Sequence, residues 1–533
     1  MEKFITCSKC QEKGDKDRAG AVQIHACGDS CFVPDIQALT PSLKQETPTL
    51  QMEQLTERKP IDGQEMSLGD PEVDFSEWYN EIVEEAGLTD KRYPVKGMNV
   101  WPPYGWKAMM LIDNIVRNSF DVRGHQEVYF PLLIPRNEFE KEKEHIKGFD
   151  AQVFWVTKAG ENELDIPLLL RPTSETAMYP LFAIWIRSHA DLPLRIYQIV
   201  NTFRYETKQT RAFIRVREIH FIEGHTCHST FEDAERQIQE DLEIMDEIAR
   251  KLCLPYRIHR RTEWDKFPGA YYTNAIDTLM PDGRTLQIAS IHQYRNNFAI
   301  PYGIYFEDLD GQRKPVFQTT YGMSERMLGA VVAVHGDEKG LKFPPAIAPI
   351  QFVIVPIPLK GEQKKIERFC AGIYRRLQKA GFRVHYDARD IRPGNKFYEW
   401  EKKGVPVRLE IGKREMEEKY LTAVRRDTGK REKIPLNSLK SSLLNLFASI
   451  EQSLYESALK REKGMERFIE DISKPAEGLN LVWWCGKEEC GKEIEERSGI
   501  TLLGTKEKHD YGAGRCAICA SETSTLAVLG RPL

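Results

Sequence analysis

The chain of 533 residues contains no apolar run near the roughly 18 residues that a membrane-spanning helix needs. Its first residues, Met-Glu-Lys-Phe-Ile-Thr-Cys, lack the apolar core of a secretory signal peptide. It also lacks a strong charge of either sign, since 76 Lys and Arg stand against 80 Asp and Glu, a net charge of −4. These absences argue against a membrane protein, a secreted protein and a polybasic coat protein, while a local basic face stays compatible with a nucleic-acid partner. We expect a cytoplasmic protein.

Glycine-rich phosphate-binding loops are also absent. The chain contains neither a Gly-x4-Gly-Lys-Ser/Thr sequence nor a Gly-x-Gly-x-x-Gly sequence. The nucleotide-binding folds that cradle phosphates with such loops are therefore disfavoured.

Cysteine is scarce in the middle of the chain and concentrated at its two ends. This placement argues against a disulfide framework and indicates metal sites. Near the C-terminus, Cys485-x4-Cys490 and Cys516-x2-Cys519 form two close pairs, which predicts a closed, structural zinc site of four thiolates. At the N-terminus, a similar zinc site competes with a disordered or partly folded tail; its ligands are Cys7, Cys10, Cys27 and Cys31, with His25 able to replace one thiol.

Composition and periodicity predict five segments along the chain. These are a Cys-rich extension (1–32), a linker rich in Pro, Gln, Glu, Thr and Ser (33–72), a large body (73–345), a second body (346–450) and a C-terminal unit (451–533).

The order of elements differs between the two bodies. In the first body, strand-like runs at 128–134 and 194–200 mix with helical stretches at 75–86 and 231–252, which predicts an antiparallel-rich α/β core. The second body shows a βαβ rhythm, which predicts a small α/β domain with a partly parallel sheet; its elements are a strand at 351–355, a helix at 362–380 and a strand at 382–386. A further helix is expected over 440–475.

Candidate functional residues gather between 171 and 326. Arg204 and Arg215 flank a charged loop, and a strand–loop–strand structure would place both guanidiniums over one site. Arg326, at an expected helix start after Gly322, offers a third guanidinium. The guanidinium group of Arg is planar and permanently charged, so one Arg can bind two oxygens of a polyphosphate at once. Three converging Arg with nearby carboxylates suit a nucleotide, its divalent cation and a displacement at phosphorus.

Each of these patterns alone is more often a surface ion pair or an ordinary turn, but their order along the chain is informative. Phe203-Arg204-x-Glu206, Arg215-Val-Arg-Glu and Gly322-x-x-x-Arg326 resemble motifs 2 and 3 of the class II aminoacyl-tRNA synthetases. Residues 128–135 resemble motif 1, a dimer-forming segment with a Pro.

Further runs resemble one family within this class, the prolyl-tRNA synthetases of the archaeal and eukaryotic type, over about residues 74–533. They are Arg171-Pro-Thr173-Ser-Glu175-Thr, Trp264-Asp-Lys-Phe267-Pro-Gly, Gln287-x-x-Ser290-x-His292, His335-Gly-Asp-Glu-Lys-Gly-Leu and Asp390-Ile-Arg-Pro-Gly-Asn-Lys396-Phe-Tyr-Glu-Trp. The resemblance implies an α/β multidomain protein, with an antiparallel-sheet class II catalytic core (73–345), an α/β anticodon-binding domain (346–450) and a small C-terminal zinc-binding domain (451–533). It implies a ligase that activates L-proline with ATP and Mg²⁺ and transfers it to the 3′-end of tRNA(Pro).

The resemblance also implies roles for particular residues, none of them a covalent nucleophile. Arg204 and Arg326 would be catalytic through charge neutralisation. The implied proline-binding residues are Thr173, Glu175, Arg204, Phe221, Phe267 and His292. The implied ATP-binding residues are Arg204, Glu206, Arg215, Val216 through its backbone, Gln287, Ser290, Ser324 and Arg326, with Gln287 and Ser290 touching ATP or its magnesium.

The remaining implications concern partners. A basic loop with Arg389, Arg392 and Lys396, beside Phe397, Tyr398 and Trp400, would bind tRNA, since charge and aromatic faces suit unstacked RNA bases. The resemblance further implies a homodimer and a structural zinc ion on Cys485, Cys490, Cys516 and Cys519. Bacterial-type relatives insert an editing domain between motifs 2 and 3; residues 226–286 are too few for one, so we expect no editing domain here.

Two departures from the family pattern stand out. After His292 the family usually shows Leu-Gly-Gln, whereas this chain has Gln293-Tyr-Arg-Asn-Asn297. The aromatic residue that commonly stacks on adenine is replaced by Ile219. Two alternatives therefore stay open: an RNA-binding regulatory protein with a synthetase-like fold and no aminoacylation, and a neighbouring synthetase for threonine or histidine. The Thr-x-Glu turn and the Trp-Asp-Lys-Phe-Pro-Gly run argue against the second.

Overall fold

The computed structural model describes residues 69, 71, 74–141, 150–506 and 510–533. Residues 66–533 form one compact unit. The N-terminal cysteine group, Cys7, Cys10, Cys27 and Cys31, lies outside the described residues, as does the predicted linker except for 69 and 71. Among the described residues, none of the helices has both the length and the apolar character that crossing a bilayer requires.

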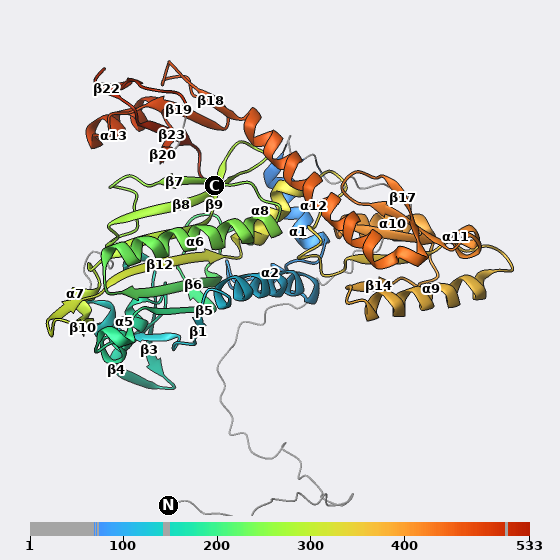
Figure 1. Cartoon of the computed structure of the whole chain (residues 1–533), viewed down its shortest axis with the longest axis horizontal. Helices are drawn as coiled ribbons and strands as arrows, with labels where there is room; N and C mark the ends of the chain where they lie inside the picture. Colours follow the sequence, from blue (N-terminus) through green and yellow to red (C-terminus); the bar gives the residue numbers. More distant parts are fainter. Residues whose placement is uncertain (1–68, 70, 72–73, 142–149, 507–509) are drawn as a thin grey trace, which may run out of the picture. The chain divides into compact units, whose positions relative to one another are not determined.

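A twisted, mostly antiparallel sheet of 11 strands is the centre of the molecule (Figure 1). Every pairing from β5 to β19 is antiparallel, and only the two edge pairs, β1 with β5 and β18 with β19, are parallel. The antiparallel-rich core predicted from the sequence is confirmed. In spatial order the strands are β1 (Gln126–Glu127), β5 (Leu194–Phe203), β6 (Glu218–His228), β12 (Phe317–Ser324), β9 (Thr285–Arg295), β8 (Tyr272–Leu279), β7 (Arg257–Arg260), β20 (Thr501–Lys506), β23 (Leu526–Gly530), β19 (Leu479–Trp483) and β18 (Glu466–Phe468).

Helices cover this sheet with their apolar faces. They are α1 (Phe75–Glu85), α2 (Pro103–Asp121), α6 (Phe231–Lys251) and α8 (Arg326–His335), and α6 packs on β6, β9 and β12. The predicted helix at 231–252 is α6, which begins where the Thr230 hydroxyl accepts a hydrogen bond from the Asp233 amide at 3.1 Å. Residues 226–286, where the sequence leaves no room for an inserted domain, form the end of β6, α6, β7, β8 and the start of β9.

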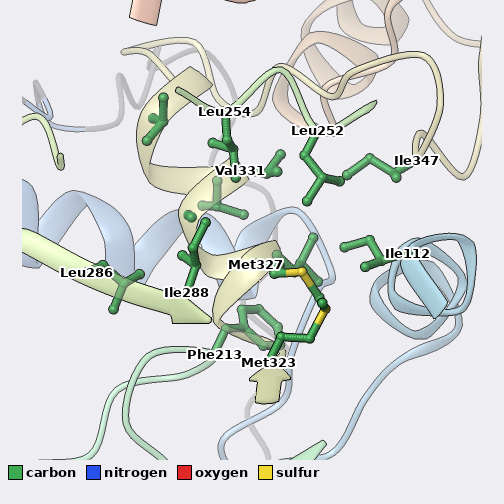
Figure 2. Packing of buried hydrophobic residues seen from close by; sticks show 14 of the residues in the cluster. Ile112, Phe213, Leu252, Leu254, Leu286, Ile288, Met323, Met327, Val331 and Ile347 are labelled. Carbon is green, nitrogen blue, oxygen red and sulfur yellow. The ribbon is translucent and has the colours of Figure 1, made fainter. Parts of the chain in front are cut away.

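Helix α8 is apolar on every side after its first residue. All nine residues from Met327 to His335 are buried, as expected for a helix in the middle of a core. Figure 2 shows Met323, Met327 and Val331 packed near Phe213 and Ile288. Because the body of α8 is fixed in this core, its first residue, Arg326, is held in one place.

The strand predicted at 128–134 is wrong for residues 128–132. The short strand β1 ends before this run, and only β2 (Leu133–Pro135) forms at its end. Strand β2 pairs in a small sheet with β4 (Asn162–Leu170), which in turn pairs with β3 (Phe154–Ala159). Pro131 has no amide hydrogen to donate to a ladder. The Phe130 amide instead donates to Gln198 Oε1 at 3.0 Å, and Arg171 Nη1 donates to the Phe130 carbonyl at 2.7 Å. Side chains therefore satisfy the backbone that strand pairing leaves open. The elements α3 (Arg136–Phe139) and α5 (Glu175–Trp185) contact this small sheet and each other.

A separate five-stranded sheet follows in the order β14-β13-β15-β16-β17. Strand β13 (Phe352–Pro356) is parallel to β14 (Val384–Tyr386) and to β15 (Val407–Ile411), while β16 (Tyr420–Arg425) and β17 (Arg431–Pro435) are antiparallel. This is the partly parallel sheet predicted from the βαβ rhythm, and the predicted helix at 362–380 is α9 (Gln363–Lys379). The prediction of one basic loop up to Trp400 is wrong, because α10 (Pro393–Lys402) begins at Pro393, whose fixed φ suits a first helical turn.

The C-terminal part joins the central sheet. Helix α12 (Leu439–Gly464) ends at Gly464, so the helix predicted over 440–475 is too long, and β18 lies in the part that is not helical. The boundary expected at 450 falls inside α12. Strand β20 pairs with β7 at Thr505 and Arg260. A Cβ atom at Gly504 would lie 2.4 Å from the Arg260 carbonyl oxygen, so only glycine permits this approach. The rest of this part is α13 (Glu488–Ser498) and the pair β21 (Gly514–Arg515) and β22 (Glu522–Thr523).

Candidate active site

A cavity of about 480 Å³ lies over the central strands β6, β9 and β12 and the start of α8. All residues that the sequence analysis assigned to proline or to ATP line this one cavity. They are Thr173, Glu175, Arg204, Glu206, Arg215, Val216, Phe221, Phe267, Gln287, Ser290, His292, Ser324 and Arg326.

The alternation of strand residues explains how distant segments reach the same cavity. Successive side chains of a strand point to opposite faces, so residues two apart share a face. Phe221 and Glu223 on β6, Ser290 and His292 on β9, and Gly322 and Ser324 on β12 are such pairs, and each residue lines the cavity. Strand β12 lies between β6 and β9, which places the three pairs side by side.

Three guanidinium groups converge at this cavity. Arg326 donates from Nε to the Ile214 carbonyl at 2.8 Å, and Arg204 donates from Nε to the Pro172 carbonyl at 3.1 Å. Arg215 forms an ion pair with Glu206 at 3.5 Å. Burial, together with repulsion from Arg204 and Arg215, lowers the pKa of Arg326 to about 10. Burial also lowers the pKa of Arg204, against the opposing effect of Glu175 and Glu223. The cavity therefore holds a concentration of partly buried positive charge that suits a polyanion.

A carboxylate and a set of rings line another part of the cavity wall. Glu175, the first residue of α5, is 1% exposed, and its Oε2 accepts a hydrogen bond from the Thr173 hydroxyl at 2.5 Å. His292 shares a hydrogen bond of 2.9 Å with Thr273, and its ring centre lies 4.6 Å from that of Phe267. Burial lowers the pKa of His292 to about 4, so this ring is neutral near pH 7. The arrangement offers a fixed anion beside apolar walls.

Glu223 and His225 were assigned no role from the sequence. Glu223 lines the cavity and accepts from Gln198 Nε2 at 2.9 Å, and its Oε2 lies 3.2 Å from His225 Nε2. Burial would raise the pKa of Glu223, but the hydrogen bond and charge of His225 hold it below its usual range. The alternation Phe221-x-Glu223-x-His225 is the signal that predicts a shared face for these residues.

Arg261 was missed because no local pattern marks it. Its Nη2 donates to Gln287 Oε1 at 3.0 Å and lies 3.3 Å from Asp277 Oδ2, and the residue lines the cavity. Arg261 therefore fixes the side chain of Gln287, and only the pairing of β7, β8 and β9 brings these residues together.

The predicted tRNA-binding residues lie around Asp387 in the smaller sheet's domain. Arg389 pairs with Asp387 at 2.7 Å and with Glu399 at 2.8 Å. Lys396 is 3% exposed and donates to the Asp387 carbonyl at 2.9 Å, and Trp400 Nε1 donates to Asp387 Oδ2 at 2.9 Å. Despite its burial, Asp387 has a pKa well below the usual range, because Arg389 and Trp400 bind its carboxylate. Lys396 and Trp400 thus hold the segment together, whereas Arg392 and Tyr398 are exposed.

The four C-terminal cysteines meet at one place. The sulfur atoms of Cys485, Cys490, Cys516 and Cys519 all lie within 4.8 Å of one another. Four thiolates at this spacing fit a tetrahedral zinc ion, for which Zn–S distances are about 2.3 Å. The cluster is coupled to the cavity wall, because Trp484 lies edge-on to Trp264, with ring centres 6.0 Å apart, and Trp264 lines the cavity.

Three protein-family models match this chain in sequence. They are the "tRNA synthetase class II core domain (G, H, P, S and T)" over residues 154–335, the "Anticodon binding domain" over 351–446 and "Prolyl-tRNA synthetase, C-terminal" over 465–532.

Two curated relatives align with this chain over almost their whole length. A proline–tRNA ligase of Thermococcus kodakarensis is 51% identical over 469 residues, which is 86% of this chain and 97% of the relative. A proline–tRNA ligase of Pyrococcus horikoshii is 51% identical over 471 residues, which is 86% of this chain and 98% of the relative.

Solved structures show the same fold. The prolyl-tRNA synthetase of Giardia lamblia in complex with prolyl-adenylate superposes with a TM-score of 0.84 at 33% identity, covering 88% of this chain and 100% of that one. The prolyl-tRNA synthetase of Cryptosporidium parvum, complexed with halofuginone and AMPPNP, gives a TM-score of 0.83 at 32% identity, covering 88% of this chain and 99% of that one.

Proposed function

The chain belongs to the prolyl-tRNA synthetase family of class II, and we propose that it joins L-proline to tRNA(Pro) in two steps that share the cavity described above. In the first step the carboxylate of proline attacks the α-phosphorus of ATP; the bond to the β-phosphate oxygen breaks, and prolyl-adenylate and pyrophosphate form. In the second step a hydroxyl of the terminal ribose of tRNA attacks the acyl carbon, and AMP leaves. Both steps need positioning and charge neutralisation more than a covalent nucleophile.

The proposed roles follow from the charge distribution of the cavity. The charge of Arg204 interacts with those of Glu175 and Arg326, and its proposed role is to bridge the proline carboxylate and the α-phosphate. Arg215 and Arg326, with Ser324 beside them, bind the outer phosphates. Glu206 and the backbone of Val216 contact the nucleotide. Gln287 and Ser290, which line the cavity, carry oxygens of the hard donor type that Mg²⁺ prefers, and they would hold the ion that accompanies ATP; it would supply neutralisation of phosphate charge.

The proline end of the cavity is proposed at Glu175. Its carboxylate and the Thr173 hydroxyl receive the substrate amine, while Phe221, Phe267 and the neutral His292 enclose the ring. The observation that carries this proposal is the meeting, in one cavity, of three guanidiniums with a buried carboxylate beside apolar walls.

Further parts of the proposal concern metal, tRNA and assembly. The four-cysteine cluster binds a structural zinc ion, and the exposed side of the segment around Arg389 and Arg392 meets the anticodon loop.

We propose a homodimer, supported by large apolar side chains that are exposed on the small sheet and α5: Leu133, Trp155, Ile166, Ile184 and Trp185. An enzyme that charges tRNA for protein synthesis works in the cytoplasm, and we propose that location and no editing of mischarged tRNA within this chain.

The deciding experiment is ATP–pyrophosphate exchange with the full chain across amino acids. Proline-dependent exchange, with little exchange for threonine or histidine, supports the proposal. Exchange with threonine or histidine alone would assign the chain to a neighbouring specificity. Binding of RNA without exchange for any amino acid would indicate an RNA-binding protein that has lost activation. Sedimentation of the wild type and of Trp185→Glu tests the dimer, which we expect this substitution to weaken.

A further inference from the structure

We infer that Tyr294 is a positioning residue for the substrate amine: its hydroxyl holds the carboxylate of Glu175 in the orientation that receives the amine of proline. The inference rests on the function proposed above and deepens it. Tyr294 lies in the run 293–297, where the sequence departs from the family pattern, and it does not itself line the cavity.

The position of Tyr294 follows from the geometry of β9. Ser290, His292 and Tyr294 are two residues apart, so they point to the same face of the strand. The first two line the cavity, and Tyr294 continues their row beyond its end. At this point the pairing of β9 with β12 shifts by one residue, since Gln318 pairs with Arg295 and Thr319 with Gln293. Tyr294 is the extra residue at this shift, and its ring stays nearly parallel to that of His292.

The Tyr294 side chain reaches the carboxylate on α5. The Tyr294 hydroxyl donates to Glu175 Oε1 at 2.9 Å, while the Thr173 hydroxyl donates to Glu175 Oε2 at 2.5 Å. Tyr294 is fully buried and Glu175 is 1% exposed, so no water replaces either bond. Each oxygen of the carboxylate is therefore fixed by one neutral hydroxyl, and the remaining acceptor positions of Glu175, which lines the cavity, are presented to it.

The ring of Tyr294 is itself held in place. Its centre lies 4.5 Å from that of Phe298 and 5.9 Å from that of Phe267, and its plane is within 11° of the His292 ring. Burial raises the pKa of Tyr294 well above its ordinary value, so the hydroxyl keeps its proton and stays a donor. A site group whose supporting shell is rigid needs no rearrangement when the substrate arrives.

This arrangement acts on one part of the substrate. Proline carries a secondary ammonium with two N–H donors, which need acceptor oxygens at fixed positions. Loss of the Tyr294 hydroxyl leaves Glu175 Oε1 without its donor and frees the carboxylate to turn. The loss should therefore weaken binding of the amine and leave ATP binding and contacts to the ring unchanged.

The test compares Tyr294→Phe with the wild type in ATP–pyrophosphate exchange. We expect the KM for proline to rise about five- to ten-fold, as for a lost hydrogen bond of ordinary strength, and the KM for ATP to change less than about two-fold. The inhibition constant of tetrahydro-2-furoic acid, whose ring oxygen replaces the amine and cannot donate, should also change less than about two-fold. Tyr294→Met places an apolar side chain without a donor at this position. It should likewise raise the KM for proline and leave the inhibition constant of the furoic acid nearly unchanged.

The matched control is Tyr302→Phe. Tyr302 belongs to the same hydrophobic cluster as Tyr294, and its hydroxyl donates to the Glu138 carbonyl at 3.1 Å, away from Glu175. This variant should keep the wild-type KM for proline. Equal weakening of proline and of the furoic acid in Tyr294→Phe, or no weakening of either, would overturn the positioning role while the proposed function stands. A wild-type protein without proline-dependent exchange would overturn both.

Discussion

Arg326, the first residue of α8, donates from Nε to the backbone carbonyl of Ile214 at 2.8 Å, across 112 residues of sequence. The bond ties the helix that is buried in the core to the loop between β5 and β6. That loop carries Arg215, and Arg204 stands at its start, so one contact sets the spacing of the three guanidiniums. Two of the three charges of the cavity are thus carried by a loop that the buried helix α8 holds in place.

Arg204→Ala should abolish activation. We expect proline-dependent ATP–pyrophosphate exchange to fall by about 10²–10³-fold, because the variant lacks the guanidinium proposed to neutralise charge where it develops. Circular dichroism and the oligomeric state should stay unchanged. The control is Arg236→Ala on α6, whose exposed side chain pairs only locally with Asp233. Near-normal exchange in Arg204→Ala would remove its assigned role.

The stability of the protein should show the titration of Glu325. Burial raises the pKa of this carboxyl from 4.5 to about 7, and its Oε2 has no hydrogen-bond partner within the described residues. The folded state therefore keeps a proton that the unfolded chain releases above pH 4.5. This proton contributes up to about 3 kcal/mol to the free energy of unfolding. The contribution is fully present below pH 4.5, declines as the pH rises toward 7 and is lost above pH 7.

Glu325→Gln should remove this dependence. We expect the melting temperature of the variant, relative to the wild type, to be higher at pH 8 than at pH 5. Glu338 is exposed, so the melting temperature of Glu338→Gln should differ from that of the wild type by the same amount at both pH values. A Glu325→Gln difference that is equal at the two pH values would contradict the raised pKa.

Loss of a cysteine ligand should release metal and disturb the cavity wall. Cys519→Ser is expected to lower the zinc content by about one ion per chain, measured by metal mass spectrometry, and to lower the melting temperature. Because Trp484 beside the cluster packs against Trp264, the KM for proline should also rise. Cys370→Ser, in the core of the smaller sheet's domain, should leave the zinc content unchanged. Unchanged zinc content in Cys519→Ser would argue against this site.

Arg392→Ala should separate the two steps of the reaction. Arg392 is exposed at the start of α10, so its removal should raise the KM for tRNA about three- to ten-fold and reduce the salt dependence of tRNA binding. ATP–pyrophosphate exchange should stay at the wild-type level. Arg414→Ala, an exposed Arg on α11 (Lys413–Glu418) of the same domain, is the matched control. Equal effects of the two substitutions would show that position 392 has no particular role.

Local patterns were sufficient to predict much of the fold. Helices such as α6 and α9 follow from apolar residues at helical spacing together with their end signals, and β5 and β13 follow from runs of branched apolar residues. Failures came where side chains replaced strand pairing, as at Phe130, or where a helix began inside an expected loop, as at Pro393. At Phe130 the partners, Gln198 and Arg171, lie far away in sequence. At Pro393 the signal was local, a proline at the first helical position, and it was overlooked.

The sequence by itself determined which residue types were available for the cavity and in what order, because alternation along a strand and the first turn of a helix are local properties. Only the tertiary structure decided that β20 continues the central sheet, that Arg261 holds Gln287, that Lys396 is buried against Asp387, and that Tyr294 reaches Glu175 from 119 residues away. Strand register and helix packing select these partners. Both depend on burying the whole apolar surface at once, which no short segment encodes.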